Sequence, residues 1–178
     1  DILDLSKFES GNMSLDKQMI ALPIIIDTVV RELSLQFKQK NIGVVKNYGA
    51  NLPDVFVDAE KVGQVMMNIL SNAMKFTKSG GAVTIATSLQ ADQPDGAAEK
   101  KDVVQVSVTD SGVGIAPEEI SQLFERYKQV SSAKRTKQKG TGLGLSICKL
   151  IVQSHGGRMN VESEVGKYTT FHFTLPIA

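Results

Sequence analysis

The sequence predicts an α/β fold, an α+β sandwich in which a mixed, mostly antiparallel sheet of about five strands carries its helices on one face. Two observations lead to this prediction. Amphipathic helical patterns are interspersed with short runs of β-branched residues along the whole chain. The later strand patterns occur in neighbouring pairs joined by turns or polar loops, which favours hairpins over crossover connections. A doubly wound parallel sheet is therefore disfavoured.

The predicted elements follow from periodicity and from turn signals. Helical spacing of apolar residues predicts helices at 1–11, 22–40, 58–78, 117–125 and 143–155. Asp58 is the expected N-cap of the third of these, and Gly80 and Gly81 follow its end. Strand patterns occupy 44–45, 55–57, 83–89, 103–109, 159–162 and 170–175. A turn at 51–53 lies between the first two strands, and the polar segment 90–101 is the predicted loop of a hairpin.

Length and composition set limits on the class of protein. The 178 residues are 42% hydrophobic, enough for one compact domain. The formal net charge of +1 gives no argument for a nucleic acid partner, and we expect none. A single cysteine, Cys148, excludes an internal disulfide. No apolar stretch is long enough to cross a bilayer, so we expect a soluble, cytoplasmic domain. Because the chain starts at Asp1, we expect a fragment of a longer protein, whose other parts could include a membrane anchor.

A polar strip on the helix predicted at 58–78 is the first candidate for chemistry. At 100° per residue, Asn68, Asn72 and Lys75 fall within a narrow arc beside a broad apolar arc. A carboxamide oxygen is a hard neutral ligand that suits Mg²⁺, and a lysine supplies positive charge to phosphate oxygens. The same pattern also fits an ordinary solvated helix face.

The second candidate is the end of the strand predicted at 103–109. Period-two alternation places Val106, Val108 and Asp110 on one face, so that a carboxylate ends an apolar stripe. Such a carboxylate needs a donor, and the exocyclic amine of adenine would supply one where guanine has a carbonyl. Gly112 and Gly114 would let a flat base approach the backbone closely. A plain turn in which Asp110 caps a backbone amide remains the alternative.

A glycine-rich run is the third candidate, because it leads directly into a helix. Gly140, Thr141, Gly142, Leu143 and Gly144 precede the helix predicted at 143–155, whose unpaired amides and dipole would favour a phosphate. The run fits neither the dinucleotide fingerprint nor a P-loop. Upstream, a basic cluster could cover the phosphates or could be a solvated loop; it consists of Lys134, Arg135, Lys137 and Lys139.

Together these motifs resemble the ATP-binding domain of sensor histidine kinases, in the GHKL superfamily. Residues 68–77 are similar to the N box, 110–114 to the first glycine box, 123–127 to the F box and 140–145 to the second glycine box. Residues 1–11 resemble the end of the helical dimerisation domain that precedes the ATP site in such kinases. The resemblance implies two parts, with the end of a helical domain at 1–14 and a catalytic domain at 15–178.

The resemblance also implies roles for individual residues. Asn72 would bind Mg²⁺, Asn68 and Lys75 would act near the phosphates, Asp110 would accept the adenine amine, and Phe124 would anchor a lid. The remaining implied nucleotide contacts are Gly112, Gly114, Ile115, Lys139, Gly140, Thr141, Gly142, Leu143, Gly144 and Thr170.

The implied function is to hold ATP and Mg²⁺ so that a histidine on a separate dimerisation domain attacks the γ-phosphate. A response regulator would be the downstream partner, and the fragment would be a monomer of a homodimeric parent. His155 and His172 match no phosphoacceptor pattern, so both are expected to be structural. In the hydrolytic members of the superfamily, a glutamate that activates water holds the position of Asn68. Because an amide cannot take that proton, the resemblance disfavours a hydrolytic ATPase.

Two departures from the family pattern leave an alternative open. Tyr168 replaces a glycine of the closing motif, and Gln129 stands where many members have an arginine. A degenerate module that binds nucleotide without transferring phosphate is therefore the second hypothesis.

Overall fold

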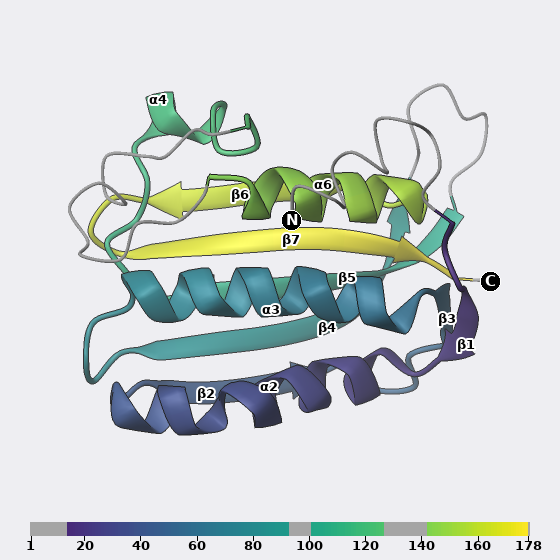
Figure 1. Cartoon of the computed structure of the whole chain (residues 1–178), viewed down its shortest axis with the longest axis horizontal. Helices are drawn as coiled ribbons and strands as arrows, with labels where there is room; N and C mark the ends of the chain where they lie inside the picture. The colour runs from purple at the N-terminus through teal and green to yellow at the C-terminus, as the bar shows by residue number, and fades with distance from the viewer. Residues whose placement is uncertain (1–13, 93–100, 127–141, 178) are drawn as a thin grey trace.

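The computed structural model describes residues 14–92, 101–126 and 142–177 (Figure 1). Its elements in chain order are β1 (Gln18–Ile20), α2 (Leu22–Gln39), β2 (Gly43–Tyr48), β3 (Val55–Val57), α3 (Ala59–Phe76), β4 (Ala82–Asp92), β5 (Lys101–Asp110), α4 (Pro117–Ile120), α6 (Gly144–Ser154), β6 (Met159–Glu164) and β7 (Tyr168–Pro176). The helix predicted at 1–11 lies outside the described residues.

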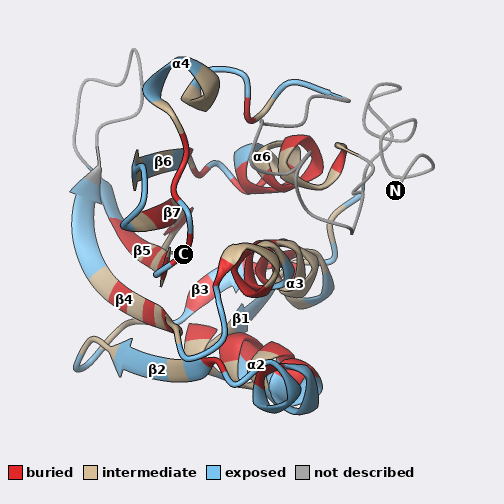
Figure 2. Cartoon of the chain, turned by 90° about the vertical axis from the view of Figure 1, so that its left-hand side faces the viewer, coloured by how far each residue is buried: buried red, intermediate tan, exposed pale blue. Residues whose placement is uncertain are grey.

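A five-stranded sheet in the order β2-β4-β5-β7-β6 forms one layer of the molecule. Only β2 and β4 run parallel, and the other neighbours are antiparallel. The helices α2, α3 and α6 lie side by side against one face, and no helix among the described residues covers the opposite face (Figure 2). The predicted fold class is therefore confirmed.

The structure shows how the strands that flank residues 51–53 pair, and it corrects the sequence predictions at two other elements. The strand β2 joins the large sheet, whereas β3 pairs with β1. The short strand β1 was not predicted at all. The helix predicted at 117–125 ends at Ile120, after which the backbone continues as turns with hydrogen bonds between residues three apart, such as Gln122 N to Glu119 O.

The hydrophobic core lies between the sheet and α3. This helix buries Met66, Ile69 and Leu70 completely, and β5 turns Val106 and Val108 towards them. Burying side chains of this size stabilises the fold by about 1.5 to 3 kcal/mol for each residue. Because α3 is fixed by its apolar side, its polar strip is held in a constant position at the edge of the core.

His155 joins the end of α6 to the start of α3. Its Nε2 accepts a hydrogen bond from the backbone amide of Asp58 at 3.0 Å, and its Nδ1 lies 2.8 Å from the carbonyl oxygen of Ile151. Because an amide can only donate, Nε2 is unprotonated and Nδ1 carries the hydrogen. Burial lowers the pKa of this imidazole. Asp58 is the N-cap of α3, as predicted, and accepts from the backbone amide of Lys61.

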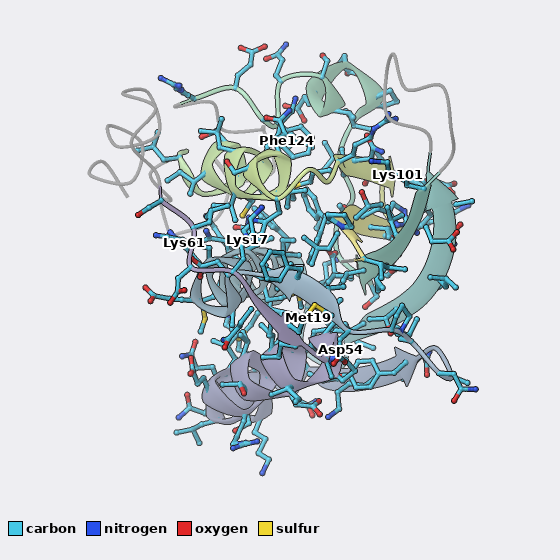
Figure 3. All side chains as sticks on the ribbon, turned by 90° about the vertical axis from the view of Figure 1, so that its right-hand side faces the viewer. Lys17, Met19, Asp54, Lys61, Lys101 and Phe124 are labelled. Atoms are coloured by element: carbon cyan, nitrogen blue, oxygen red, sulfur yellow. The ribbon has the colours of Figure 1, made fainter. Side chains whose placement is uncertain are left out.

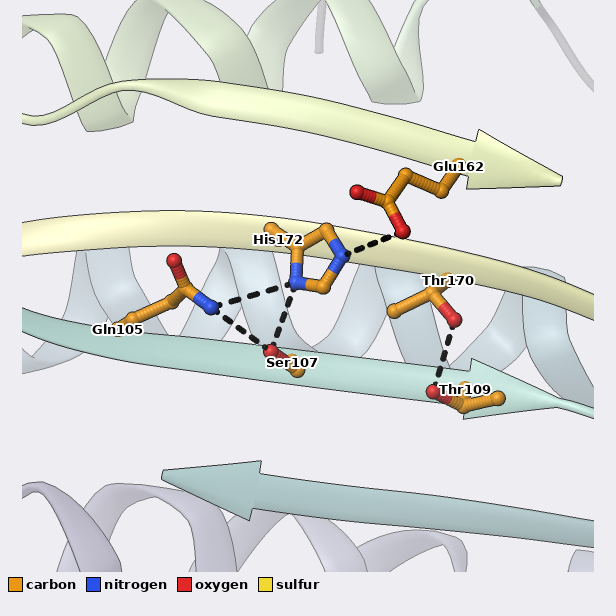
Figure 4. Close-up of polar contacts among 6 residues, drawn as sticks. All are labelled: Gln105, Ser107, Thr109, Glu162, Thr170 and His172. Carbon is orange, nitrogen blue, oxygen red and sulfur yellow. Dashed lines mark hydrogen bonds and ion pairs between the residues drawn. The ribbon is translucent and has the colours of Figure 1, made fainter. Parts of the chain in front are cut away.

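His172 lies on β7, and its side chain is on the face of the sheet that the helices leave uncovered (Figure 4). Its Nδ1 is 2.7 Å from the hydroxyl oxygen of Ser107. Both histidines thus connect secondary structure elements. Within the described ranges, no helix is both long and apolar enough to cross a membrane.

Candidate functional site

The polar strip of α3 is formed by Asn68, Asn72 and Lys75, which are all half-buried. They lie beside the residues that pack into the core, because the helix turns its apolar arc to the sheet. Burial lowers the pKa of the Lys75 ammonium, whose Nζ is 5.4 Å from the centroid of the Phe76 ring. The strip therefore offers two carboxamides and one partly desolvated cation.

The N-terminus of α6 lies next to this strip. A Cβ atom built on Gly144 would be 3.5 Å from the Asn68 side-chain oxygen, so the first residue of α6 faces the first asparagine of the strip. The first amides of a helix have no partner within the helix and carry the positive end of its dipole. Gly142, just before α6, has a φ of +72°, a conformation that favours glycine.

Cys148 of α6 lies next to Asn68 of α3. Its thiol is fully buried between α3 and α6, and burial raises its pKa to about 12. A hydrogen bond from the Asn68 side chain acts in the opposite direction on this pKa.

Asp110 forms the second part of the site at the end of β5. Its side chain is 4% exposed, and burial raises the pKa of its carboxyl to about 6. The backbone amide of Gly112 donates to it, with 2.9 Å between N and Oδ1, and opposes this shift. The carboxylate is therefore a buried acceptor, and a hydrogen bond from a further donor would stabilise its charged form.

The loop after Asp110 fits tightly between α3 and the β6–β7 hairpin. A Cβ atom on Gly112 would be 2.8 Å from the carbonyl oxygen of Phe76, the last residue of α3. Gly114 has a φ of +70°, and a Cβ atom there would clash with the backbone of Glu164. Only glycine fits both positions, and the loop is brought to the C-terminal end of the helix that bears Asn68, Asn72 and Lys75.

The structure describes three of the other predicted site residues, Phe124, Leu143 and Ile115, and leaves three outside the described ranges. The side chain of Phe124 packs against α6, with its ring centroid 5.3 Å from Nζ of Lys149 (Figure 3). Leu143 is buried directly before α6, and the backbone amide of Ile115 is bonded to Ser163. Lys139, Gly140 and Thr141 fall outside the described residues, as do the other members of the basic cluster.

Thr170 is not brought to this site. Its hydroxyl lies 2.8 Å from that of Thr109, on the face of the sheet turned away from the helices (Figure 4). Its neighbour Thr169 is buried on the same face as Asp110, its register partner on β5. Sequence reasoning missed Thr169, although the alternation with Phe171 and Phe173 carries the signal.

The described residues include no cluster of three or more histidine, cysteine, aspartate or glutamate side chains that could hold a metal ion. A cation at α3 would therefore depend on the carboxamide oxygens of Asn68 and Asn72 and on oxygens that the ligand itself brings. Mg²⁺ suits such a donor set, because it binds oxygen, keeps several waters and often shares its coordination with substrate phosphates.

Comparison with known proteins identifies the group to which this arrangement belongs. Residues 57–178 match the family described as "Histidine kinase-, DNA gyrase B-, and HSP90-like ATPase". The chain belongs to this family. The match begins at the end of β3 and includes α3, the loop after Asp110, α6 and the closing hairpin.

Individual members of the family are similar over nearly the whole chain. The sensor histidine kinase WalK of Bacillus subtilis is 34% identical over 99% of this chain, which corresponds to 27% of WalK. The structure of full-length ShkA in complex with AMPPNP superimposes with a TM-score of 0.81 at 26% identity, over 99% of this chain and 34% of that one. The catalytic domain of the histidine kinase ThkA gives 0.73 at 27% identity, over 92% and 96%. The chain spans less than half the length of the curated relatives it matches.

Membership in this family supports ATP as the ligand of the domain. The resemblance to sensor histidine kinases is confirmed, and the fold agrees with that of histidine kinase catalytic domains.

Proposed function

We propose that this chain binds ATP with Mg²⁺ and positions the γ-phosphate for transfer to a histidine on a separate helical dimerisation domain of a longer kinase. The observation that carries the proposal is the position of α3 between two other motifs. Asn68 borders Gly144 at the start of α6, and Phe76 borders Gly112 in the loop after Asp110. One helix thus connects a buried carboxylate with an anion-attracting helix terminus.

The purine would lie at the Asp110 end of this arrangement. A buried carboxylate accepts a hydrogen bond from the exocyclic amine of adenine and is left unpaired, or repelled, by the carbonyl that guanine has there. Gly112 does not itself make room for the base, because a Cβ atom there would meet Asp110 and the backbone of Phe76. Its lack of a side chain instead lets the loop pack against α3 beside the carboxylate.

The triphosphate would extend towards α6. The free amides and dipole of the α6 N-terminus favour anionic oxygens, and the ammonium of Lys75 adds a positive charge from α3. Asn72 would hold Mg²⁺ through its carboxamide oxygen, and Asn68 would lie beside the phosphates. When bound, the ion would neutralise charge on the phosphate oxygens.

Transfer rather than hydrolysis is the expected chemistry. Asn68 stands where a general base for water would be needed, and a carboxamide cannot accept that proton. In the transfer, a ring nitrogen of the incoming histidine forms a bond to the γ-phosphorus while the bond to the bridging oxygen breaks, and ADP leaves with that electron pair. The domain contributes position and charge, and the nucleophile comes from outside this chain.

A reconstitution experiment tests the proposal. The chain is mixed with a separately prepared dimerisation domain and γ-labelled ATP, and we expect acid-labile label on a histidine of that domain. The Asp110→Asn variant should label much more slowly, while Asp102→Asn, an exposed residue at the start of the same strand, should behave like the wild type. ATP binding by calorimetry without any labelling would support the alternative of a nucleotide-binding module that does not transfer phosphate.

The structure bears on one of the two departures from the family pattern, the tyrosine at position 168 in place of a glycine. Tyr168 lies in β7, and the position that needs a positive φ in the preceding turn is Gly166, at +80°. A side chain at 168 therefore does not disturb that turn. Gln129 lies outside the described residues, so the comparison of transfer and binding has to be made by experiment.

A further inference from the structure

We propose that Ser163 is a positioning residue of the purine pocket, which fixes the direction of the Thr169 hydroxyl so that Thr169 presents only lone pairs beside Asp110. This inference rests on the proposed nucleotide site and adds a residue that determines its specificity. Ser163 itself would not touch the nucleotide. Its effect would pass through Thr169 and through the loop after Asp110.

The three residues form a row across adjacent strands. Asp110 on β5 is the register partner of Thr169 on β7, and Thr169 is the register partner of Ser163 on β6. Directly opposite residues of antiparallel strands have Cβ atoms about 4.5 to 5.5 Å apart, so the side chains are within contact distance. Asp110 and Thr169 are only 4% and 5% exposed. Their hydrogen-bonding pattern therefore has to be met by the protein or by a ligand.

The Ser163 hydroxyl has three polar neighbours, which together assign a direction to each of its hydrogen bonds. Its hydroxyl donates to the carbonyl oxygen of Tyr168 at 2.8 Å, which uses its only proton. It accepts from the backbone amide of Ile115 at 2.8 Å. The hydroxyl oxygen of Thr169 is 2.9 Å away. With the Ser163 proton placed on Tyr168, Thr169 is the donor in this last contact.

The polarity of Thr169 follows from this assignment. Its single hydroxyl proton is used on Ser163, so its oxygen can only accept from any other neighbour. Beside it lies the Asp110 carboxylate, which is also an acceptor. The end of the pocket thus presents two acceptors, which suits an amino group and disfavours a carbonyl group. If Ser163 were absent, the Thr169 hydroxyl could turn and donate to Asp110 or to a carbonyl ligand.

Ser163 also holds the loop that would cover the base. Its bond to Ile115 joins residues 48 apart in sequence, and the amide of Gly166 donates to the carbonyl oxygen of Val113 at 2.8 Å. Between these two bonds, Gly114 lies directly against the backbone of Glu164. The loop is therefore attached to the β6–β7 hairpin at both sides of Gly114, and the Ser163 side chain accepts one of these two hydrogen bonds.

The test compares ATP with inosine triphosphate, which differs only in having a carbonyl and a ring N–H where adenine has an amine and a ring acceptor. For each variant, calorimetry gives the dissociation constant of inosine triphosphate divided by that of ATP, and this ratio measures the preference for ATP. We expect Ser163→Ala to weaken ATP binding about threefold to tenfold, the scale of one hydrogen bond, and to reduce the preference for ATP by a similar factor. Ser163→Thr retains the hydroxyl and should restore the wild-type ratio.

Two further variants separate polarity from folding. Ser107→Ala removes a hydroxyl that contacts His172 on the uncovered face of the sheet, and it should leave the ratio unchanged. Thr169→Val removes the proposed acceptor but keeps the bond between Ser163 and Ile115, and it should lower the ratio even if Ser163→Ala does not fold. In the Thr169→Val background, Ser163→Ala should change the ratio no further.

The outcomes distinguish this inference from the proposed function. A wild-type chain that binds neither nucleotide would overturn the proposed function. A wild-type chain that prefers ATP, with the same preference in folded Ser163→Ala or in Thr169→Val, would overturn only the role of Ser163 and Thr169.

Discussion

The backbone amide of Gly112 donates a hydrogen bond to the carboxylate of Asp110, with 2.9 Å between N and Oδ1. This bond turns the chain back over the carboxylate directly after β5 ends. It satisfies one acceptor position of a side chain that is almost completely buried. It does not compensate for burial, because the pKa of Asp110 is still raised to about 6. The carboxylate is thus held in place at a cost in stability, which is typical of a binding residue.

Replacement of this carboxylate should weaken nucleotide binding. We expect Asp110→Asn to reduce the affinity for ATP by about 1.5 to 3 kcal/mol, the scale of losing a charge-assisted hydrogen bond. The asparagine oxygen can still accept from Gly112, so the loop should keep its conformation. Calorimetry measures the effect, and Asp102→Asn on the exposed part of β5 is the matched control. Equal affinities for ATP in Asp110→Asn and the wild type would contradict the adenine contact.

The same substitution should have the opposite effect on the stability of the nucleotide-free protein. A carboxyl whose pKa rises from 3.8 to about 6 on folding favours the folded state at low pH, and this contribution is lost as the pH rises through 6. At pH 7.5, Asp110→Asn should therefore be more stable than the wild type by about 1 to 3 kcal/mol. The difference should shrink as the pH falls towards 4. Urea unfolding at several pH values measures it, and a difference that does not depend on pH would argue against the raised pKa.

The sequence was sufficient for the elements that carry a strong local signal. The apolar arc of α3 has helical periodicity over its whole length, and Asp58 caps it, so helix and polar strip could be predicted together. The alternation of β5 places Asp110 inside for the same reason. These patterns are strong because one face of each element is buried over many residues.

Contacts that arise only from pairing or packing could not be predicted. The strand β1 is three residues long and exists because it pairs with β3, so it has too few residues for a period. The alternation along β7 indicates that Thr169 rather than Thr170 shares the face of Phe171, but only the register of β7 with β5 places it opposite Asp110. The close approach of Asn68 to Gly144 depends on how α3 and α6 pack, which neither helix encodes by itself.

Removal of a magnesium ligand should change how ATP binding depends on the metal. In the wild type we expect Mg²⁺ to increase the affinity for ATP, because the ion would connect the phosphates to Asn72. In Asn72→Ala this increase should disappear, while binding without Mg²⁺ should remain similar. Calorimetric titrations with and without Mg²⁺ provide the comparison. Ser71→Ala, an exposed neighbour on α3, is the control, and a full magnesium effect in Asn72→Ala would exclude Asn72 as a ligand.

Alanine substitutions at Gly114 and Gly166 should distinguish the cost of backbone strain from the cost of a steric clash. Both Gly114 and Gly166 have positive φ, at +70° and +80°, and an alanine there would cost about 1 to 2 kcal/mol of unfolding free energy from backbone strain. At Gly166 no heavy atom lies within 4 Å of an added Cβ, so Gly166→Ala should cost no more than this. At Gly114 the Cβ would clash with the Glu164 backbone, which cannot move as a flexible side chain can, and the total cost should be about 2 to 5 kcal/mol. Urea unfolding gives both values. Because Gly114 lies in the loop after Asp110, Gly114→Ala should also lose affinity for ATP, whereas Gly166→Ala should retain most of it. Equal losses of stability and of ATP affinity in the two variants would mean that the close approach of the loop to the hairpin does not matter for the site.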